Sequence, residues 1–212
     1  MKVVPAYETV GNKLDWKPWN KRARWNPCQK ISWKINTKGA PANAKKMTKQ
    51  AFDKVHRATG LRFVYQGKTT AVPWRDDKGK KRSGADVDIA WATKRQVKEL
   101  GGGTVGWGGV FWNARLVNYR GGISLLRSAN MSSAPGPGAT WQNLILHEIG
   151  HVVGLDHAKG KRQVMYPQIP ESLGRFQRGD LRGLHHLGAD NGCKRTRSDR
   201  AVVGTAGFAA GP

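Results

Sequence analysis

The chain has 212 residues, a length that suits one domain with a sizeable hydrophobic core. Its 37 Lys and Arg residues against 14 Asp and Glu residues give a formal net charge of +23, and 38% of the residues are hydrophobic. No apolar run reaches the length needed to span a bilayer, which excludes a transmembrane helix. The basic surplus is expected to draw the protein toward anionic polymers or surfaces, although no motif for specific nucleic-acid recognition is identifiable.

The spacing of apolar residues predicts both strands and helices along the chain. A polar and basic segment comes first, and its Trp16 and Trp19 are expected to pack onto the domain. Alternating or continuous apolar runs predict strands at residues 30–36, 61–66, 85–91 and 121–127. Helical spacing predicts helices at residues 40–59, between Thr140 and Gly154, and at residues 177–187. The glycine-rich stretch at residues 101–112 is predicted to be irregular, and the tail after Cys193 to be disordered.

The predicted helix before Gly154 carries residues at the spacing of a catalytic zinc site. His147 and His151 are four residues apart, so a helix projects both imidazoles from one face. Glu148 flanks that face, where it can contact a water on the metal and act as its base. The helix is expected to end at Gly154, so that the chain turns back and His157 supplies a third nitrogen. The alternative is a buried amphipathic helix whose histidines only form hydrogen bonds.

A methionine follows the third histidine within a short loop. Met165 lies in the run Val164-Met165-Tyr166-Pro167, where a tight turn would place a soft, polarizable floor below the metal. The eleven-residue histidine motif followed by such a Met-turn is the metzincin signature. Around both motifs, residues 154–157 and 164–167 resemble the matrixins, the branch related to the matrix metalloproteases. The resemblance covers about residues 25–190 and is most specific between residues 147 and 167.

The resemblance implies an α+β fold and a hydrolytic activity. The fold would have a twisted, mostly parallel sheet with an antiparallel edge strand, long helices that include the zinc-binding helix, and a C-terminal helix after the Met-turn. His147, His151 and His157 would hold one catalytic Zn²⁺, and Glu148 would act as the general base in peptide-bond hydrolysis. The expected partner is a protein or peptide substrate, and the expected state is a monomer. A catalytically silent basic protein of this fold, binding nucleic acid or an anionic cell envelope, is the alternative.

The resemblance also implies a place for the substrate. An extended peptide is expected to lie antiparallel along a strand at the sheet edge, at Gly122, Ile123, Ser124 and Leu125. Tyr166 and Pro167 are expected to form a wall of the pocket for the side chain after the cut. Tyr166 follows Met165 directly, one residue earlier than the tyrosine that serves as an extra zinc ligand in some metzincins, and is not expected to be a ligand.

Several further polar residues keep two interpretations each. Asp156 and Asp180 are expected either to orient the ligands and the Met-turn, or only to cap a helix or form a salt bridge. Asp86 matches a position that contributes to calcium binding in some relatives, but its companions are missing, so structural Ca²⁺ stays open. No second zinc is expected, because the histidine-rich site of the animal enzymes is missing between Trp91 and Gly121. The remaining histidines are expected at the surface or in packing: His56, His185 and His186.

The two cysteines, Cys28 and Cys193, bracket nearly the whole predicted catalytic domain. A disulfide between them would close a very long loop and stabilise the fold by roughly 4–5 kcal/mol. Two free thiols are the alternative, whereas residues 25–29 do not match the motif with which animal matrixins inhibit their zinc. The N-terminus lacks the apolar core of a signal peptide, so secretion would require a leader removed from this chain or release by lysis, as from a phage-infected cell. The predicted regions are a basic extension at residues 1–24, the matrixin-like domain at 25–190 and a basic, Gly- and Ala-rich tail at 191–212.

Overall fold

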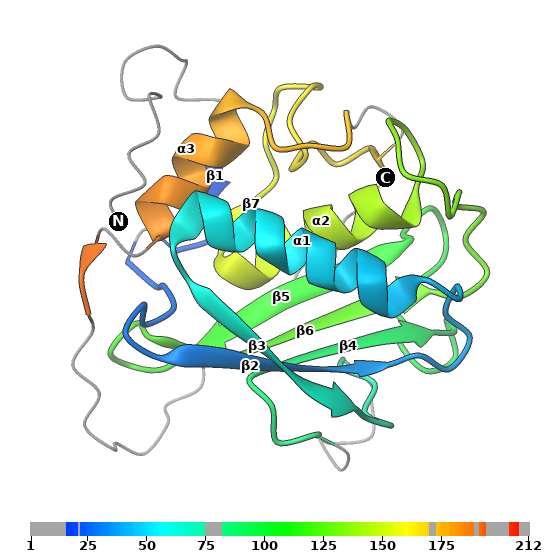
Figure 1. The fold of residues 1–212 in the computed structure, drawn as a ribbon, viewed down its shortest axis with the longest axis horizontal. Coiled ribbons are helices and arrows are strands. Elements are labelled where there is room, and N and C mark those ends of the chain that lie inside the picture. Colours follow the sequence, from blue (N-terminus) through cyan, green and yellow to red (C-terminus); the bar gives the residue numbers. More distant parts are fainter. Residues whose placement is uncertain are drawn as a thin grey trace.

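A mixed sheet forms one layer of the protein (Figure 1). The computed structural model describes residues 16–20, 22–74, 82–169, 173–188, 191–193 and 204–207. Six strands pair in the order β3-β2-β4-β6-β5-β8, with bounds β2 Lys30–Asn36, β3 Arg62–Lys68, β4 Val87–Ala92, β5 Gly106–Trp112, β6 Asn118–Leu126 and β8 Gly204–Gly207. Strands β3, β2, β4 and β6 run parallel, β5 is antiparallel to β6, and β8 is antiparallel to β5. A separate pair joins β1 (Lys17–Pro18) to β7 (Leu155–Asp156).

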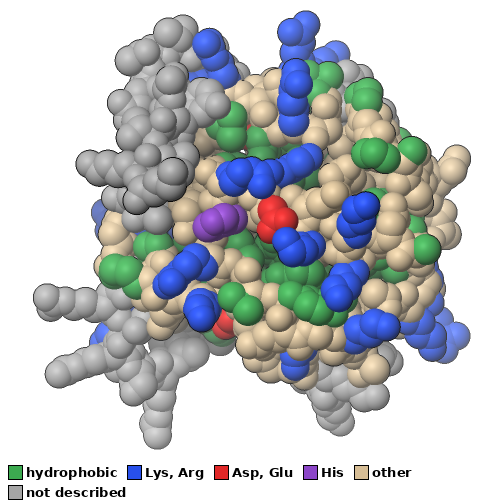
Figure 2. Space-filling model, in the orientation of Figure 1, with side chains coloured by type: hydrophobic (Ala, Val, Ile, Leu, Met, Phe, Trp, Pro, Cys, Tyr) green, Lys and Arg blue, Asp and Glu red, His purple; other side chains and the backbone are tan. Residues whose placement is uncertain are grey.

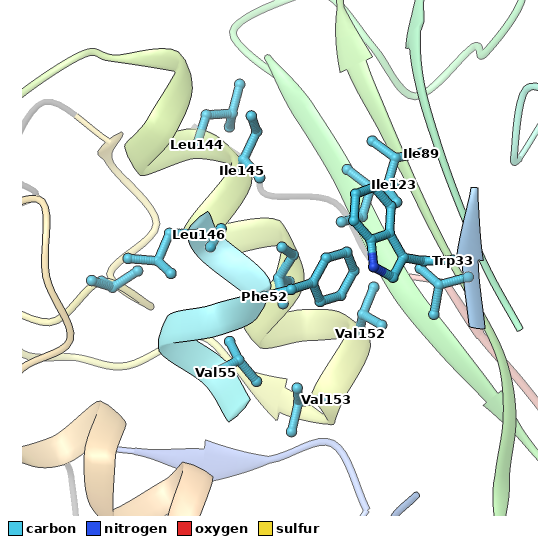
Figure 3. Packing of buried hydrophobic residues seen from close by; sticks show 14 of the residues in the cluster. Trp33, Phe52, Val55, Ile89, Ile123, Leu144, Ile145, Leu146, Val152 and Val153 are labelled. Atoms are coloured by element: carbon cyan, nitrogen blue, oxygen red, sulfur yellow. The ribbon is translucent and has the colours of Figure 1, made fainter. Parts of the chain in front are cut away.

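Two helices cover one face of this sheet, and a third packs beside them (Figure 1). They are α1 (Ala44–Thr59), α2 (Trp141–Val153) and α3 (Arg178–Leu187). Figure 3 shows apolar side chains of α1 and α2 directed toward Trp33 of β2, Ile89 of β4 and Ile123 of β6. Every residue of α2 except Gln142 is buried. The predicted catalytic helix is therefore the centre of the core, and its polar side chains lie in a water-poor environment.

Local signals set the ends of α2 where the sequence predicts them. The side chain of Thr140 accepts a hydrogen bond from the backbone N–H of Asn143 (3.1 Å), which satisfies one of the free donors of the first turn. Gly154 ends the helix with φ of 123°, a conformation that other residues adopt only with strain. By contrast, α1 begins at Ala44 rather than residue 40, with Asn43 at the cap position.

Three sequence predictions about the sheet are wrong. The stretch predicted to be irregular contains β5, since pairing with β6 outweighs the weak strand preference of its glycines. The strand predicted at the edge, β6, lies inside the sheet between β4 and β5, and is parallel to β4. The prediction of disorder after Cys193 fails at residues 204–207, the part of that tail that the structure describes, because they form β8, which pairs with Gly109 to Trp112 of β5. The antiparallel strand at this side of the sheet is therefore β5, with β8 outside it.

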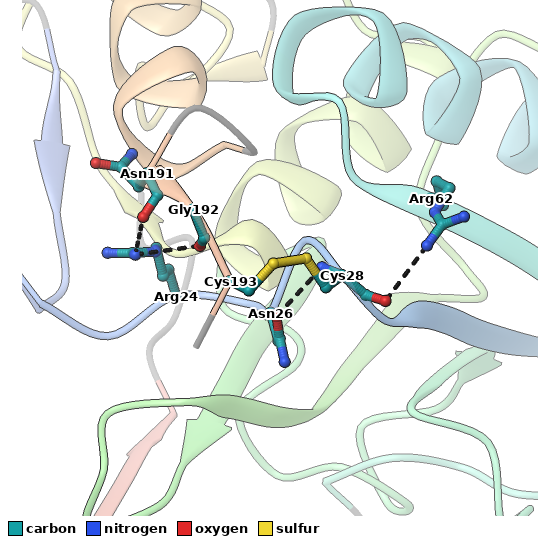
Figure 4. The surroundings of a disulfide bond; sticks show 7 residues. All are labelled: Arg24, Asn26, Cys28, Arg62, Asn191, Gly192 and Cys193. Atoms are coloured by element: carbon teal, nitrogen blue, oxygen red, sulfur yellow. Dashed lines mark hydrogen bonds between the residues drawn. A yellow bond between two sulfur atoms is a disulfide. The ribbon is translucent and has the colours of Figure 1, made fainter. Parts of the chain in front are cut away.

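The predicted disulfide is present between Cys28 and Cys193 (Figure 4). It joins residues 165 positions apart, with a Cα–Cα distance of 5.5 Å. Beside it, the guanidinium of Arg24 donates to the backbone carbonyl of Asn191 (2.5 Å). These contacts tie the chain after α3 to the segment before β2.

The surface charge is dispersed over the face that Figure 2 displays. Lys and Arg side chains are spread across it and separated by apolar and uncharged residues, rather than gathered in one patch. None of the helices in the described part of the chain is long and apolar enough to cross a membrane.

Candidate metal centre

Three imidazoles converge at the C-terminal half of α2. The Nε2 atoms of His147 and His151 are 3.1 Å apart, and the ligand atoms of these two residues and His157 all lie within 4.8 Å of one another. His147 and His151 come from successive turns of the helix, while Gly154 turns the chain so that His157 returns toward them. Among the described residues, this is the one cluster of three or more His, Cys, Asp or Glu side chains with the spacing of a metal site.

Hydrogen bonds on the far side of two rings decide where their protons lie. The Nδ1 atom of His147 is 2.7 Å from the carbonyl oxygen of Val164, and that of His151 is 2.8 Å from the carbonyl oxygen of Leu155. A carbonyl only accepts, so each Nδ1 carries the proton and each Nε2 presents a lone pair. Burial lowers the pKa of His147 to about 3, and the pKa of His151 is also well below its usual value. Both imidazoles are therefore neutral at physiological pH.

This arrangement fits a divalent metal ion. Two lone pairs facing each other at 3.1 Å repel unless a cation lies between them. The buried Nε2 of His157 has no hydrogen-bond partner among the described residues. Tetrahedral zinc with bonds of about 2.0–2.1 Å places its nitrogen ligands about 3.4 Å apart, close to the spacing of the first pair. The donor set and the orphaned nitrogen both fit zinc.

Glu148 lies beside the histidines and is fully buried. Neither carboxylate oxygen has a hydrogen-bond partner of good geometry in the described structure. Burial raises the pKa of Glu148 to about 8, and the nearby backbone N–H of Gly108 offsets only part of that rise. A carboxyl that is buried without a protein partner at a metal centre is typical of a group that exchanges a proton with substrate or water.

Two glycines of β5 make room for this carboxyl group. A Cβ atom at Gly106 or at Gly108 would overlap the carboxylate of Glu148. The two glycines are two positions apart on β5, so both lie on the same face of the sheet, the one that faces α2. Sequence reasoning missed them, because it assigned no strand here. The signal that could have found them is the period-two placement of glycines in Gly106-Trp107-Gly108.

The Met-turn packs against α2 at Gly150. Gly150 lies between the two histidine turns, and a Cβ atom there would overlap the Sδ of Met165. The carboxylate of Asp180, which is 0% exposed, accepts hydrogen bonds from the backbone N–H groups of Val164 (2.7 Å), Met165 (3.1 Å) and Gln177 (2.9 Å). Asp180 therefore both anchors the Met-turn and caps α3. Both of the roles that the sequence left open for it are present.

Asp156 has a similar double role beside the third histidine. Its Oδ1 accepts a hydrogen bond from the backbone N–H of His157 (2.7 Å), and its Oδ2 is 2.6 Å from the Nζ of Lys17. The carboxylate thus restrains the backbone of His157 and also forms an ion pair.

Comparison with known families agrees with this geometry. The sequence model of the matrixin family matches residues 24–188, which is most of the chain. The chain belongs to the matrixin family. No curated protein matches the sequence. Matrixins use zinc and are metallopeptidases, so membership supports a metalloprotease-type function and a peptide substrate. The α+β matrixin fold predicted from the sequence is confirmed.

The strand predicted to hold the substrate, β6, has no free edge in this sheet. Gly122, Ile123, Ser124 and Leu125 pair with β4 on one side and with β5 on the other. Their backbone groups are therefore occupied, and no peptide can add there. Ser124 instead donates from its hydroxyl to the carbonyl of Pro73 (2.6 Å), on the sheet face opposite α2. The predicted peptide strand along these residues is wrong, because β6 is an inner strand.

The other predicted residues lie as follows. Tyr166 and Pro167 are half-buried directly after the Met-turn, so their role in a substrate pocket stays a prediction. Asp86 accepts two hydrogen bonds from Ser32, from its backbone N–H (2.7 Å) and from its hydroxyl (2.6 Å), and so links the start of β4 to β2. The histidines away from the cluster take part in packing or face solvent: His56, His185 and His186.

Proposed function

We propose that this matrixin is a zinc endopeptidase that hydrolyses peptide bonds with Glu148 as the general base. The observation that carries the proposal is the buried, unpartnered carboxylate of Glu148 next to three converging, neutral imidazoles. A purely structural metal site has no use for such a carboxylate, since burying it without a partner costs stability.

His147, His151 and His157 would hold the zinc through their Nε2 atoms. When bound, zinc would act as a Lewis acid at the scissile carbonyl and lower the pKa of the attacking water. The carbonyls of Val164 and Leu155 fix the ring orientations and the tautomers of the first two ligands. The Met165 side chain, seated on Gly150, supports the ligands from below.

Glu148 would take the proton of the attacking water and deliver it to the leaving amine. Its environment supports both halves of that transfer. Its oxygens have no well-aligned hydrogen-bond partner in the described structure and are available to water. Burial raises the pKa of Glu148, which makes the ionised carboxylate a stronger base and lets the carboxyl retain the proton until the amine departs, at the cost of a smaller ionised fraction at neutral pH.

The substrate is proposed to lie along β5 rather than β6. In the described structure, β8 pairs with Gly109 to Trp112 and leaves the outer edge of Gly106 to Gly108 unpaired, next to Glu148. An extended peptide added to this edge would be held by main-chain hydrogen bonds. Tyr166 and Pro167 would then form a wall of the pocket beyond the scissile bond.

The proposed site of action is an oxidising compartment outside the cell. The disulfide between Cys28 and Cys193 supports this, because cytosolic reductants keep most such pairs reduced.

The proposal is tested with wild type and Glu148→Gln, each loaded with zinc, on fluorescein-labelled casein. We expect equal zinc content and a loss of about 10²–10⁴-fold in turnover for the variant. Asp53→Asn, an exposed change on α1, is the control and should keep wild-type turnover. Equal turnover in wild type and Glu148→Gln would refute the role of Glu148. A zinc-loaded wild type that cleaves no peptide would favour the silent, polyanion-binding alternative.

A further inference from the structure

The segment at residues 16–19 contacts the metal centre although it precedes the matched family region, which starts at residue 24. Lys17 and Pro18 form β1, which pairs antiparallel with Asp156 and Leu155 of β7. The backbone N–H of Trp19 continues this contact by donating to the carbonyl of Gly154 (3.0 Å). β7 lies between the second and third histidines of the cluster, His151 and His157. Residues 16–19 are therefore hydrogen-bonded to the part of the chain that brings His157 back to the cluster.

The side chain of Trp19 covers one of the histidines. Its ring stacks on the imidazole of His151, with a centroid distance of 5.1 Å and an interplanar angle of 17°. The same imidazole is held from its Nδ1 by the carbonyl of Leu155, the residue that pairs with Pro18. The ring of His151 is thus restrained in its plane by a hydrogen bond and across its face by the indole.

Lys17 reaches the third histidine through Asp156. The ion pair between Lys17 and Asp156 is 2.6 Å long, and the other oxygen of Asp156 accepts the backbone N–H of His157 (2.7 Å). The Lys17 side chain is 70% exposed, so the pair contributes little to global stability. Its effect is local, because it fixes the carboxylate that holds the backbone of His157.

Trp16 anchors the segment at its other end. Its ring lies 5.1 Å from that of His186 on α3 and packs over Gly183, where a Cβ atom would come within 3.0 Å of the indole. The segment therefore bridges α3 and β7, and its position is fixed on both sides of the turn that carries His157.

We propose that residues 16–19 form an N-terminal strap that positions His151 and His157 and slows the loss of zinc. The inference rests on the proposed metal centre and adds to it a role for chain outside the family domain. Without the strap, the turn from Gly154 to His157 loses a strand partner, and the ring of His151 loses its stacked neighbour. An aromatic pair is worth roughly two- to twelvefold in an equilibrium constant, and this is the size of the loss in zinc affinity that we expect from removing the stack. Lys17 and Trp19 are positioning residues, since they act through Asp156, His151 and His157.

The test compares wild type with Trp19→Ala, Trp19→Leu, Trp19→Phe and Lys17→Met. Zinc affinity is measured by competition with a chromophoric chelator, and zinc loss by its rate of transfer to EDTA. The visible absorption of the Co²⁺-substituted proteins reports ligand geometry independently of hydrolysis. Tyr65→Ala is the matched control, because Tyr65 is also half-buried and also packs on one aromatic ring, that of Trp33, but lies on β3, at the edge of the sheet opposite to β5 and β8.

We expect Trp19→Ala to weaken zinc binding about tenfold, Trp19→Leu to act in the same direction, and Trp19→Phe to restore most of the affinity. Lys17→Met should accelerate zinc loss at least about twofold. In the zinc-free protein, the amide of His157 should exchange faster in both Trp19→Ala and Lys17→Met. Tyr65→Ala should lower stability while its zinc affinity stays within about twofold of wild type.

Two negative results are distinguishable. If wild type binds no stoichiometric zinc, the proposed metal centre fails, and the strap with it. If wild type binds zinc and the Trp19 and Lys17 variants match it in affinity, in rate of zinc loss and in the Co²⁺ spectrum, the strap proposal alone is overturned. Should Trp19→Ala not fold, Trp19→Leu and Lys17→Met decide by the same criteria.

Discussion

Replacing Asp180 with Asn is expected to loosen the Met-turn and, through it, the metal centre. The carboxylate accepts three backbone hydrogen bonds, two at Oδ2 and one at Oδ1. An amide keeps only one acceptor, and its NH₂ group must face at least one backbone N–H. The loss is at least one charge-assisted hydrogen bond of about 1.5–3 kcal/mol, with a buried donor left facing another donor. We therefore expect a destabilisation of about 2–4 kcal/mol.

The same substitution should weaken zinc binding. The backbone N–H of Val164 donates to Asp180, while its carbonyl accepts the Nδ1–H of His147. A shift of this peptide group would move the hydrogen bond that orients His147, and such supporting contacts contribute about 10–100-fold to metal affinity.

Urea denaturation of the zinc-free protein measures the first effect, and chelator competition measures the second. Asp53→Asn is the control, because Asp53 forms only an exposed pair with Lys49 on α1 and should change stability by less than about 0.5 kcal/mol. If Asp180→Asn were as stable as this control and bound zinc as tightly as wild type, the role assigned to Asp180 would be refuted.

Three further predictions test other parts of the account. Gly150→Ala should destabilise the protein by about 1–3 kcal/mol through collision with Met165, opposite in sign to the gain that Ala gives in an open helix, and a stabilised variant in urea melts would contradict the packing. Replacing Cys28 and Cys193 with Ser should cost roughly 4–5 kcal/mol, measured the same way, and an unchanged midpoint would show that the bond does not constrain the unfolded chain. In the zinc-free protein, lowering the pH from 6.5 to 5 should remove up to about 2 kcal/mol of the contribution of His147 to stability, because the unfolded residue takes up a proton that the folded residue, with its pKa of about 3, does not. The raised pKa of Glu148 acts in the opposite direction in both proteins, so the readout is the difference in slope between wild type and His147→Gln, and equal slopes would count against the buried neutral ring.

The parts of the site that sequence reasoning anticipated are those set by local signals. The bounds of α2 follow from a hydroxyl cap at Thr140 and a glycine at position 154, both of which act within one turn of the helix. The convergence of His147 and His151 follows from their spacing on that helix. Placement of His157 needed only the turn after Gly154.

The errors concern pairings between residues distant in sequence. The glycines of β5 have little intrinsic strand preference, so their strand exists because β6 and α2 flank it. No local pattern reveals that β6 is an inner strand, since strand order depends on the crossover connections. Likewise, Trp19 was expected to pack on the domain, but that its partner is His151 depends on where β7 lies.

The most direct test of the central claim is X-ray absorption at the zinc K-edge of the zinc-loaded, metal-stoichiometric protein. The account predicts three imidazole nitrogens and one oxygen from solvent at about 2.0–2.1 Å, and a loss of one imidazole in His157→Ala. A sulfur ligand, a fourth protein nitrogen, or an unchanged spectrum in His157→Ala would contradict it.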